Sequence, residues 1–171
     1  MDKWQLDNYM RRVTRGDERA FEMLYEGMKR GVFAFAYTYL GNRADAEDAT
    51  SETFLQVKRK ADSYRLGTDV RAWVFQIAKN QSLDMLRRRK QYGAVGLDEV
   101  SEVGVEQAFP LLDDMTACLS PEEKEIVILH AVWEYKHKEI AKMLSLPLGT
   151  VTWKYNEALK KLRNQERRSD E

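Results

Sequence analysis

Apolar residues recur with helical spacing in four segments of the first half of the chain. Between Trp4 and Val13, the residues Leu6, Tyr9, Met10 and Val13 fall on one side of a helix and predict a buried face. A second helix is predicted from about Asp17 to Leu40, where "GN" at 41–42 ends it. A third is predicted over 43–62 and a fourth from about Thr68 to Lys90. The polar segment 63–69 predicts a loop.

The pattern restarts sharply at Ser120. The sequence "SPEE" offers a serine cap, a proline at the first helical position and Glu123 three residues after the cap, which together are typical of a helix start. This helix is expected to reach Trp133. A short helix over 136–144, a turn over 145–149 and a final helix over 150–168 follow. In the last helix a buried stripe is expected at Val151, Tyr155, Ala158 and Leu162.

The two halves are separated by an acidic stretch. Six acids and no Lys or Arg lie between Gly93 and Leu119, and three glycines fall in the first dozen residues. We therefore expect a flexible acidic linker with a helical turn near 109–119. The predicted fold is all-α, with a four-helix domain over 1–91, the linker over 92–118 and a three-helix domain over 119–171.

The second domain has the pattern of a helix-turn-helix. Ala141 supplies the small residue where two helices cross, and Ser145 takes a turn position often held by glycine. The same spacing also fits an ordinary three-helix bundle. Cations that flank the last helix suit phosphate contacts, although each also fits a solvated surface. The residues predicted on the outer face of that helix are Thr150, Thr152, Trp153, Lys154, Asn156 and Glu157.

Charge in the first domain is unevenly distributed. Residues 79–90 hold five cations against one acid, next to a polar loop and the aromatics Trp73 and Phe75. Cations beside aromatics suit single-stranded nucleic acid, whose bases stack and whose backbone is neutralised. The competing interpretation places Trp73, Phe75, Ile77 and Leu83 in the core. The acidic start of the third helix is either solvated or a docking face for a basic partner.

Composition excludes several classes of protein. Net charge is zero, Cys118 is the only cysteine, and His130 and His137 are seven residues apart, which is not a metal-ligand spacing. No glycine-rich phosphate loop is present. We predict a protein that is not an enzyme and needs no metal or cofactor. The longest apolar run, "VFAFAY", is far shorter than a membrane span, so a soluble, cytoplasmic protein is expected.

Four segments together resemble an extracytoplasmic-function sigma factor of the sigma-70 family, also called group IV, from bacterial RNA polymerase. They are "GDERAFEMLYEGM", "LGNRADAEDATSETFLQV", "VRAWVFQIAKNQSLDMLRRRK" and "LSPEEKEIVILHAVWEYKHKEIAKMLSLPLGTV", in the order of the conserved segments of that family. The resemblance covers nearly the whole chain apart from the linker and the last residues. It implies sigma domains 2 and 4, which bind core polymerase and start transcription at particular promoters, in the family often under stress.

The resemblance also implies partners and their residues. The chain would bind core polymerase at the beta-prime clamp helices and the beta flap. In the family, a membrane-anchored anti-sigma factor often holds the sigma factor inactive, so such a factor is an expected partner. The residues implied at the clamp helices are Asp48, Glu52, Phe54, Leu55 and Gln56. Those implied at the melted minus-10 promoter element are Arg65, Thr68, Asp69, Arg71, Lys79, Asn80, Asp84, Arg87 and Arg88. Those implied at the minus-35 duplex are Lys138, Thr150, Thr152, Trp153, Lys154, Asn156 and Lys160.

The sequence departs from the family in its reading helix. Thr152, Asn156 and Glu157 stand where cations are usual, so phosphate attraction is expected to be weaker and contacts more apolar or hydrogen-bonded. Trp153 suits either a thymine methyl group or a protein partner. Two rival interpretations remain at this stage: an autonomous helix-turn-helix repressor and a helical adaptor that binds no DNA. The repressor leaves the arginine-rich fourth helix without a role, and so does the adaptor.

Overall fold

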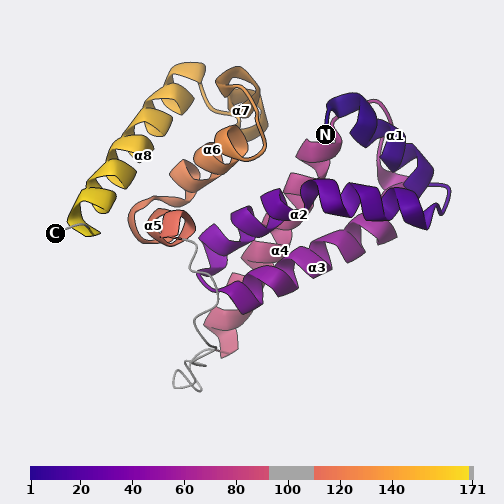
Figure 1. Ribbon diagram of the computed structural model, residues 1–171, viewed down its shortest axis with the longest axis horizontal. Coiled ribbons are helices and arrows are strands. Elements are labelled where there is room, and N and C mark those ends of the chain that lie inside the picture. Colours follow the sequence, from indigo (N-terminus) through magenta and orange to yellow (C-terminus); the bar gives the residue numbers. More distant parts are fainter. Residues whose placement is uncertain (93–109, 170–171) are drawn as a thin grey trace.

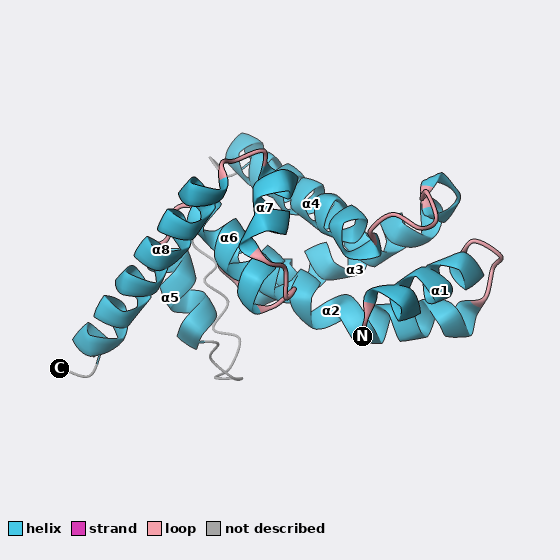
Figure 2. Cartoon of the chain, turned by 90° about the horizontal axis from the view of Figure 1, so that it is seen from above, coloured by secondary structure: helices cyan, strands magenta, loops and turns pink. Residues whose placement is uncertain are grey.

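A computed structural model describes residues 1–92 and 110–169, and all regular structure within them is helical (Figures 1 and 2). The all-α prediction is confirmed. The expected acidic linker falls mostly on residues 93–109, which lie outside the described residues. No helix in the described ranges is both long and apolar enough to cross a membrane. The helices are α1 (Lys3–Val13), α2 (Glu18–Leu40), α3 (Arg43–Arg59), α4 (Val70–Tyr92), α5 (Pro110–Cys118), α6 (Pro121–Ala131), α7 (His137–Leu144) and α8 (Leu148–Ser169), with a 3-10 turn at Ala61–Ser63.

Helix boundaries follow the local signals closely. Asp17 caps α2 by accepting a hydrogen bond from the Ala20 amide, and Asn42 caps α3 through the Asp45 amide. Gly41 ends α2 at φ 73°, a left-handed conformation that a side chain disfavours. The capping box predicted at Ser120 is present in full, because the side chains of Ser120 and Glu123 each accept the other's backbone N–H. These ends are set by residues near in sequence, which is why the sequence predicts them.

Several predicted boundaries differ from the structure by two or three residues; among them, the last helix begins at Leu148, inside the segment predicted as a turn. The third helix ends at Arg59, and the chain continues as a 3-10 turn. The sixth ends at Ala131, two residues before Trp133, which was expected to continue it. The chain reverses there: Glu134 has φ 61°, and the Tyr135 amide returns to the Leu129 carbonyl at 2.9 Å. This reversal turns Trp133 away from its own helix.

The first four helices form a bundle in which α2, α3 and α4 each pack against the other two and α1 packs against α2 and α4. Phe35 is fully buried at its centre, with ring centroids of Tyr39 and Phe75 each 4.8 Å away. The faces predicted from spacing are largely inside: Leu6, Met10 and Val13 of α1 and Phe75 and Ile77 of α4 are buried. The remaining predicted members are half-buried: Tyr9, Trp73 and Leu83. Burial of such side chains contributes about 1.5–3 kcal/mol each, so this bundle carries its own core.

The remaining helices pack against one another and against α2. Helix α5, in a segment predicted as linker with one helical turn, contacts both α2 and α8, and its Met115 is 1% exposed. Of the stripe predicted on α8, Val151, Ala158 and Leu162 are buried and Tyr155 is half-buried. A single apolar cluster runs through both halves, so the second half rests directly on the first (Figure 1).

Candidate nucleic-acid interface

Helices α7 and α8 meet in the geometry of a helix-turn-helix. Ser145 ends α7 in the left-handed conformation at φ 54° and ψ 42°, which explains why glycine is common there. The Leu146 amide returns to the Ala141 carbonyl at 2.9 Å and closes the turn. Ala141 is buried at the crossing. The tight turn and the small residue were both expected from the sequence.

The solvent side of α8 carries an aromatic side chain and an amide. Trp153 is 61% exposed and Leu148, at the start of the helix, is 50% exposed. Asn156 is exposed one turn after Trp153, and Lys160 one turn after Asn156. Thr150 and Thr152 are half-buried at the edge of this face. A groove-facing surface here would read bases through apolar contact and an amide more than through charge.

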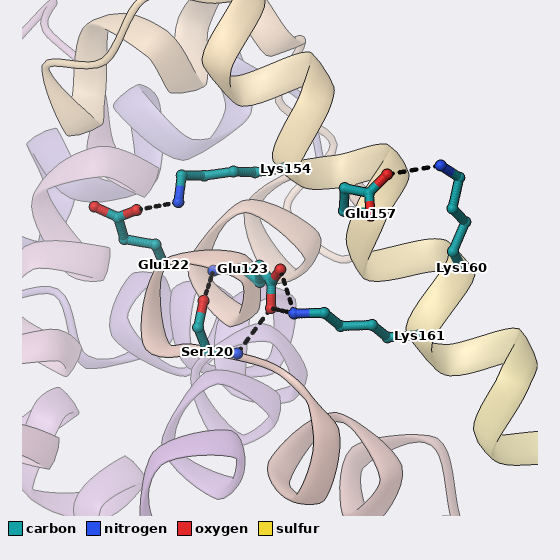
Figure 3. A network of polar contacts seen from close by, with 7 residues as sticks. All are labelled: Ser120, Glu122, Glu123, Lys154, Glu157, Lys160 and Lys161. Atoms are coloured by element: carbon teal, nitrogen blue, oxygen red, sulfur yellow. Dashed lines mark hydrogen bonds and ion pairs between the residues drawn. The ribbon is translucent and has the colours of Figure 1, made fainter.

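Lysines of α8 are held by carboxylates of the same domain (Figure 3). Lys154 Nζ lies 2.7 Å from a carboxylate oxygen of Glu122 on α6, and only 24% of the Lys154 side chain is exposed. Lys161 donates to both oxygens of Glu123 at 2.7 and 2.9 Å. Lys160 pairs with Glu157 one turn earlier at 2.6 Å but stays 64% exposed. Of these three lysines, Lys160 is the one that points to solvent.

Glu123 joins the two outer helices of the domain. Its carboxylate accepts from the Ser120 amide at 2.8 Å and from Lys161, so it ties the start of α6 to α8. Burial by itself would raise the pKa of Glu123, but the hydrogen bonds from Lys161 and Ser120 outweigh it and lower the pKa below its usual value. The pair therefore fixes the angle of α8 against α6.

The two histidines, His130 of α6 and His137 of α7, pack against each other and against α8. Their ring centroids lie 4.6 Å apart, and the Tyr155 ring lies against both. His137 Nδ1 is 3.2 Å from the Thr152 hydroxyl, which fixes one edge of the reading face. Burial, followed by the neighbouring His130, lowers the pKa of His137. Within the described residues, no group of three or more His, Cys, Asp or Glu side chains is placed to hold a metal ion.

The loop before α4 is held open to solvent. Arg65 and Thr68 are exposed, and the Gly67 amide donates to Asp7 of α1 at 2.8 Å. Tyr64 is buried beneath the loop, with its ring 5.2 Å from that of Trp73. The aromatic pair supports the loop from inside, and the exposed polar groups form its outer side.

The residues predicted at the minus-10 element lie on two different sides of α4. Asn80, Arg87 and Arg88 are exposed, and Asp84 is half-buried beside them, 3.0 Å from Arg87. The other three face α6 and the turn after it. Tyr135 donates to Asp69 at 2.9 Å, Arg71 Nη1 donates to the Trp133 carbonyl at 3.3 Å, and Lys79 pairs with Glu125 at 2.7 Å. In this arrangement those three side chains are occupied.

Four of the five residues predicted to contact polymerase share one groove. Asp48 and Leu55 are exposed, with Leu55 at 47%, and Glu52 and Gln56 are half-buried beside them. The groove between α3 and α4 is completed by Gln81, Asp84 and Arg88. Phe54 is 2% exposed and its ring packs 4.8 Å from that of Tyr25, so its place is in the core and we leave it out of this surface.

The structure adds residues that the sequence reasoning missed. Glu122 and Glu123 bind the lysines of α8, and Glu125 binds Lys79 of the other domain. The capping box singles out Glu123, but as a cap only. The paired residues are 32 to 46 positions apart in the sequence, and ion pairs over such separations leave no periodic pattern in it. Only the packing of the helices brings the partners together.

Comparison with known proteins gives matches over most of the chain. The sigma-70 region 2 family matches residues 24–92, and the sigma-70 region 4 family matches residues 110–162. The chain is 24% identical over 175 residues to ECF RNA polymerase sigma factor SigW of Bacillus subtilis, across 91% of this chain and 94% of that protein. It is 32% identical over 145 residues to ECF RNA polymerase sigma factor SigE of Mycolicibacterium smegmatis, across 78% of this chain and 56% of that one.

Two solved structures share the fold. One is CnrH in complex with the cytosolic domain of CnrY, with a TM-score of 0.69 at 19% identity over 94% of this chain and 96% of that one. The other is the sigma factor RpoE in complex with the anti-sigma factor NepR from Bartonella quintana, with a TM-score of 0.66 at 21% identity over 84% and 94%. At these identities the likeness concerns the helical arrangement.

Proposed function

The chain belongs to the extracytoplasmic-function group of the sigma-70 family and directs RNA polymerase to promoters through its regions 2 and 4, and we propose how its surface is divided between the polymerase and DNA. Sigma factors are initiation factors without enzymatic activity of their own. The proposed units are domain 2 over 1–91, a linker over 92–118 and domain 4 over 119–171. The minus-10 and minus-35 elements are assigned to domains 2 and 4.

One observation carries the assignment in domain 2. An exposed loop with Arg65 and Thr68 leads into α4, and an exposed stripe further along α4 carries Asn80, Arg87 and Arg88. The Tyr64–Trp73 pair supports the loop from inside. Flexible cations next to a rigid polar edge suit a melted strand, whose backbone is neutralised while an exposed base is held. The residues assigned to the minus-10 strand that do not contact domain 4 in this structure are Arg65, Thr68, Asn80, Asp84, Arg87 and Arg88. Asp69, Arg71 and Lys79 are also assigned to this strand, but they must first leave their partners in domain 4.

In domain 4 the reading residues are those on the outer side of α8. Thr150, Thr152, Trp153 and Asn156 take the base edges, and Lys138 and Lys160 take phosphates. Lys154 reaches DNA only after leaving Glu122. The proposed polymerase surface is the α3 groove with Asp48, Glu52, Leu55 and Gln56, which takes the beta-prime clamp helices; domain 4 takes the beta flap.

An anti-sigma factor is the remaining proposed partner. RpoE of Bartonella quintana is seen in complex with one, NepR, and this chain shares the fold of that sigma factor. Co-purification of the native chain with a protein that blocks its binding to core polymerase would identify such a partner. Recovery of the native chain bound to polymerase alone, under inducing and non-inducing conditions, would argue against it.

The division of labour is testable by transcription with core polymerase over a promoter library. Asn80→Ala is expected to reduce open-complex formation while core binding stays at the wild-type level, and Asn156→Ala is expected to relax the base preference at the minus-35 element. Gln91→Ala, also exposed on α4, and Asn164→Ala, also exposed on α8, are matched controls. If the control variants shift promoter choice as much as Asn80→Ala and Asn156→Ala do, the assigned faces are wrong.

A further inference from the structure

His137, the first residue of α7, lies between the edge of the outer face of α8 and a cluster of rings. Its Nδ1 atom is 3.2 Å from the hydroxyl oxygen of Thr152, which is within hydrogen-bond distance. Its ring centroid lies 4.6 Å from that of His130 and 4.9 Å from that of Tyr155. Thr152 is half-buried, and within the described residues its hydroxyl group has no second hydrogen-bond partner. His137 is therefore the protein group that decides how this hydroxyl group is oriented.

The partners of the two imidazole rings indicate where each ring carries its proton. His130 Nδ1 lies 2.8 Å from the carbonyl oxygen of Tyr135, and because a carbonyl only accepts, this nitrogen donates. His137 Nε2 is buried and has no hydrogen-bond partner among the described residues. In folded proteins a buried N–H without an acceptor is rarer than a buried acceptor without a donor, and the adjacent ring faces are weak acceptors. The proton of the neutral His137 ring therefore belongs on Nδ1, which donates to Thr152.

The charge of the His137 ring does not change the direction of this hydrogen bond. Burial, and after it the neighbouring His130, lowers the pKa of His137, so the neutral ring prevails at pH 7. The titratable side chains that face the ring are His130 from α6 and Tyr155 from α8, and no carboxylate of the described residues is paired with it. A protonated ring carries hydrogens on both nitrogens, so Nδ1 donates to Thr152 on either side of the pKa.

A hydroxyl group that accepts from a protein donor has its own proton available for DNA. In the major groove the acceptors are O6 and N7 of guanine, N7 of adenine and O4 of thymine, whereas cytosine presents an amino group that donates. If the Thr152 hydroxyl accepted a second hydrogen bond from that amino group, its proton would lose its acceptor in the closed interface, which is unfavourable. The contact with His137 therefore favours a base with an acceptor and disfavours cytosine.

We propose that His137 is a positioning residue for promoter recognition: by donating from Nδ1 to the Thr152 hydroxyl, it directs the hydroxyl proton toward DNA and selects a base with a major-groove acceptor at one position of the minus-35 element. This inference rests on the proposed placement of Thr152 at the minus-35 duplex. His137 itself contacts neither a base nor a phosphate in this scheme. Its replacement should consequently change the base preference at one position more than the overall affinity.

Three substitutions and a control separate the contribution of each group. Thr152→Val removes the hydroxyl group with little change in shape, and His137→Phe keeps a ring against His130 and Tyr155 but leaves the hydroxyl free to rotate. His137→Asp places a carboxylate oxygen, which only accepts, near the position of Nδ1, and an acid is favourable in the first turn of a helix. His130→Asn is the matched control, because it replaces the other imidazole and keeps an amide donor for the Tyr135 carbonyl. Circular dichroism establishes that each variant is folded.

The base preference is measured with holoenzyme made from each full-length variant, bound to a promoter library that is randomised across the minus-35 region and then sequenced. The position at which Thr152→Val changes the preference identifies the contacted base pair. There, wild type and His130→Asn should favour acceptor bases over cytosine about three- to tenfold, the value of one hydrogen bond. His137→Phe should reduce this preference to about twofold or less. His137→Asp should reverse it, because the Thr152 hydroxyl then donates inward and accepts from an amino group.

Two measurements on wild type test the direction of the hydrogen bond without any substitution. NMR of the imidazole nitrogens at pH 8 should show His137 protonated at Nδ1 and not at Nε2. The base preference should be the same at pH 8 and pH 6, because Nδ1 donates in both charge states. The opposite tautomer, or a preference that reverses between the two pH values, would overturn the proposal, since the neutral ring would then accept from Thr152.

The variants also distinguish failure of this inference from failure of the proposed function. If Thr152→Val changes the preference but His137→Phe and His137→Asp do not, Thr152 reads its base unaided and the positioning role is refuted. If His130→Asn changes the preference as much as His137→Phe does, the effect comes from the packing of the rings and the role is again refuted. If Thr152→Val changes no position, the placement of Thr152 at the DNA is wrong, and this inference fails with that part of the proposed function.

Discussion

The lysines of α8 provide a direct test of which side of the helix meets DNA. Lys160 and Lys161 are adjacent in sequence but differ in environment. Lys160 is 64% exposed and bound only to Glu157 on its own helix, whereas Lys161 donates twice to Glu123, whose side chain is 8% exposed. A surface pair three residues apart on a helix is worth only about 0.2–0.5 kcal/mol, so a phosphate displaces Glu157 easily. Lys161 would leave a largely buried carboxylate behind, which is far more costly.

The expected magnitude follows from counterion release. Each phosphate contact contributes about 0.9 to the slope of log affinity against log salt concentration. Lys160→Met should therefore reduce that slope by about 0.9, so that raising salt from 50 to 200 mM weakens this variant about 3.5-fold less than it weakens wild type. Lys161→Met should leave the slope unchanged and instead lower the stability of domain 4.

The assay is anisotropy of holoenzyme on a labelled promoter duplex at five or more salt concentrations, with urea unfolding of the free chain alongside. Lys161→Met serves as the control for Lys160→Met because it removes the same charge from the next position. Equal slope changes in the two variants would show that the effect reports net charge alone. A slope change in Lys161→Met only would place the DNA on the α6 side and refute the orientation.

Three further predictions follow from single side chains. Glu123→Gln should lower the free energy of unfolding by about 1–2 kcal/mol at pH 7, after allowance for the half-exposed Lys161, and by much less near pH 3. A carboxylate whose pKa is lowered by folding contributes stability above its unfolded pKa, and that stability is lost as the pH falls. Urea unfolding at both pH values measures the difference. The pKa of His137 is also lowered on folding, so wild type should lose stability as pH falls through about 6.5, and His137→Gln should flatten that part of the pH profile. Leu55→Glu, at an exposed position of the α3 groove, should weaken core polymerase binding at least tenfold in a competition assay with unchanged melting temperature, and an unchanged affinity would remove α3 from the interface.

Local signals in the sequence specify most of the fold. The helix-start signals at Asp17, Asn42 and Ser120 place the beginnings of α2, α3 and α6 within one residue, because a cap is satisfied by an amide three residues away. The turn at Ser145 is specified in the same way. Periodicity alone leaves the second domain undecided between a helix-turn-helix and an ordinary three-helix bundle. The family resemblance decides for the helix-turn-helix and supplies the function.

Orientation around a helix axis is less accessible from the sequence. Phe54 follows the apolar stripe of α3 and also falls in the family's docking segment, and only packing against Tyr25 decides that it is internal. Lys154 lies outside the apolar stripe of α8, yet Glu122 draws it toward α6. A helical wheel separates buried from exposed positions, but it contains no information about which neighbouring helix stands beside each exposed position.

The shortage of cations on the reading helix and the closed packing of the domains have the same consequence. Glu122 and Glu123 neutralise two lysines of domain 4, and Glu125, the next acid on α6, neutralises Lys79 of domain 2. Each proposed DNA-binding surface is thereby expected to be weaker while the chain is alone, because the charges that would attract phosphate are already paired. When polymerase holds both domains at promoter spacing, the second contact becomes intramolecular and its effective concentration rises, so two weak surfaces bind tightly together. With the surfaces proposed above, the chain should gain little from non-specific duplex, where only one surface engages at a time, and we expect its preference for promoters to depend on the polymerase that holds both domains.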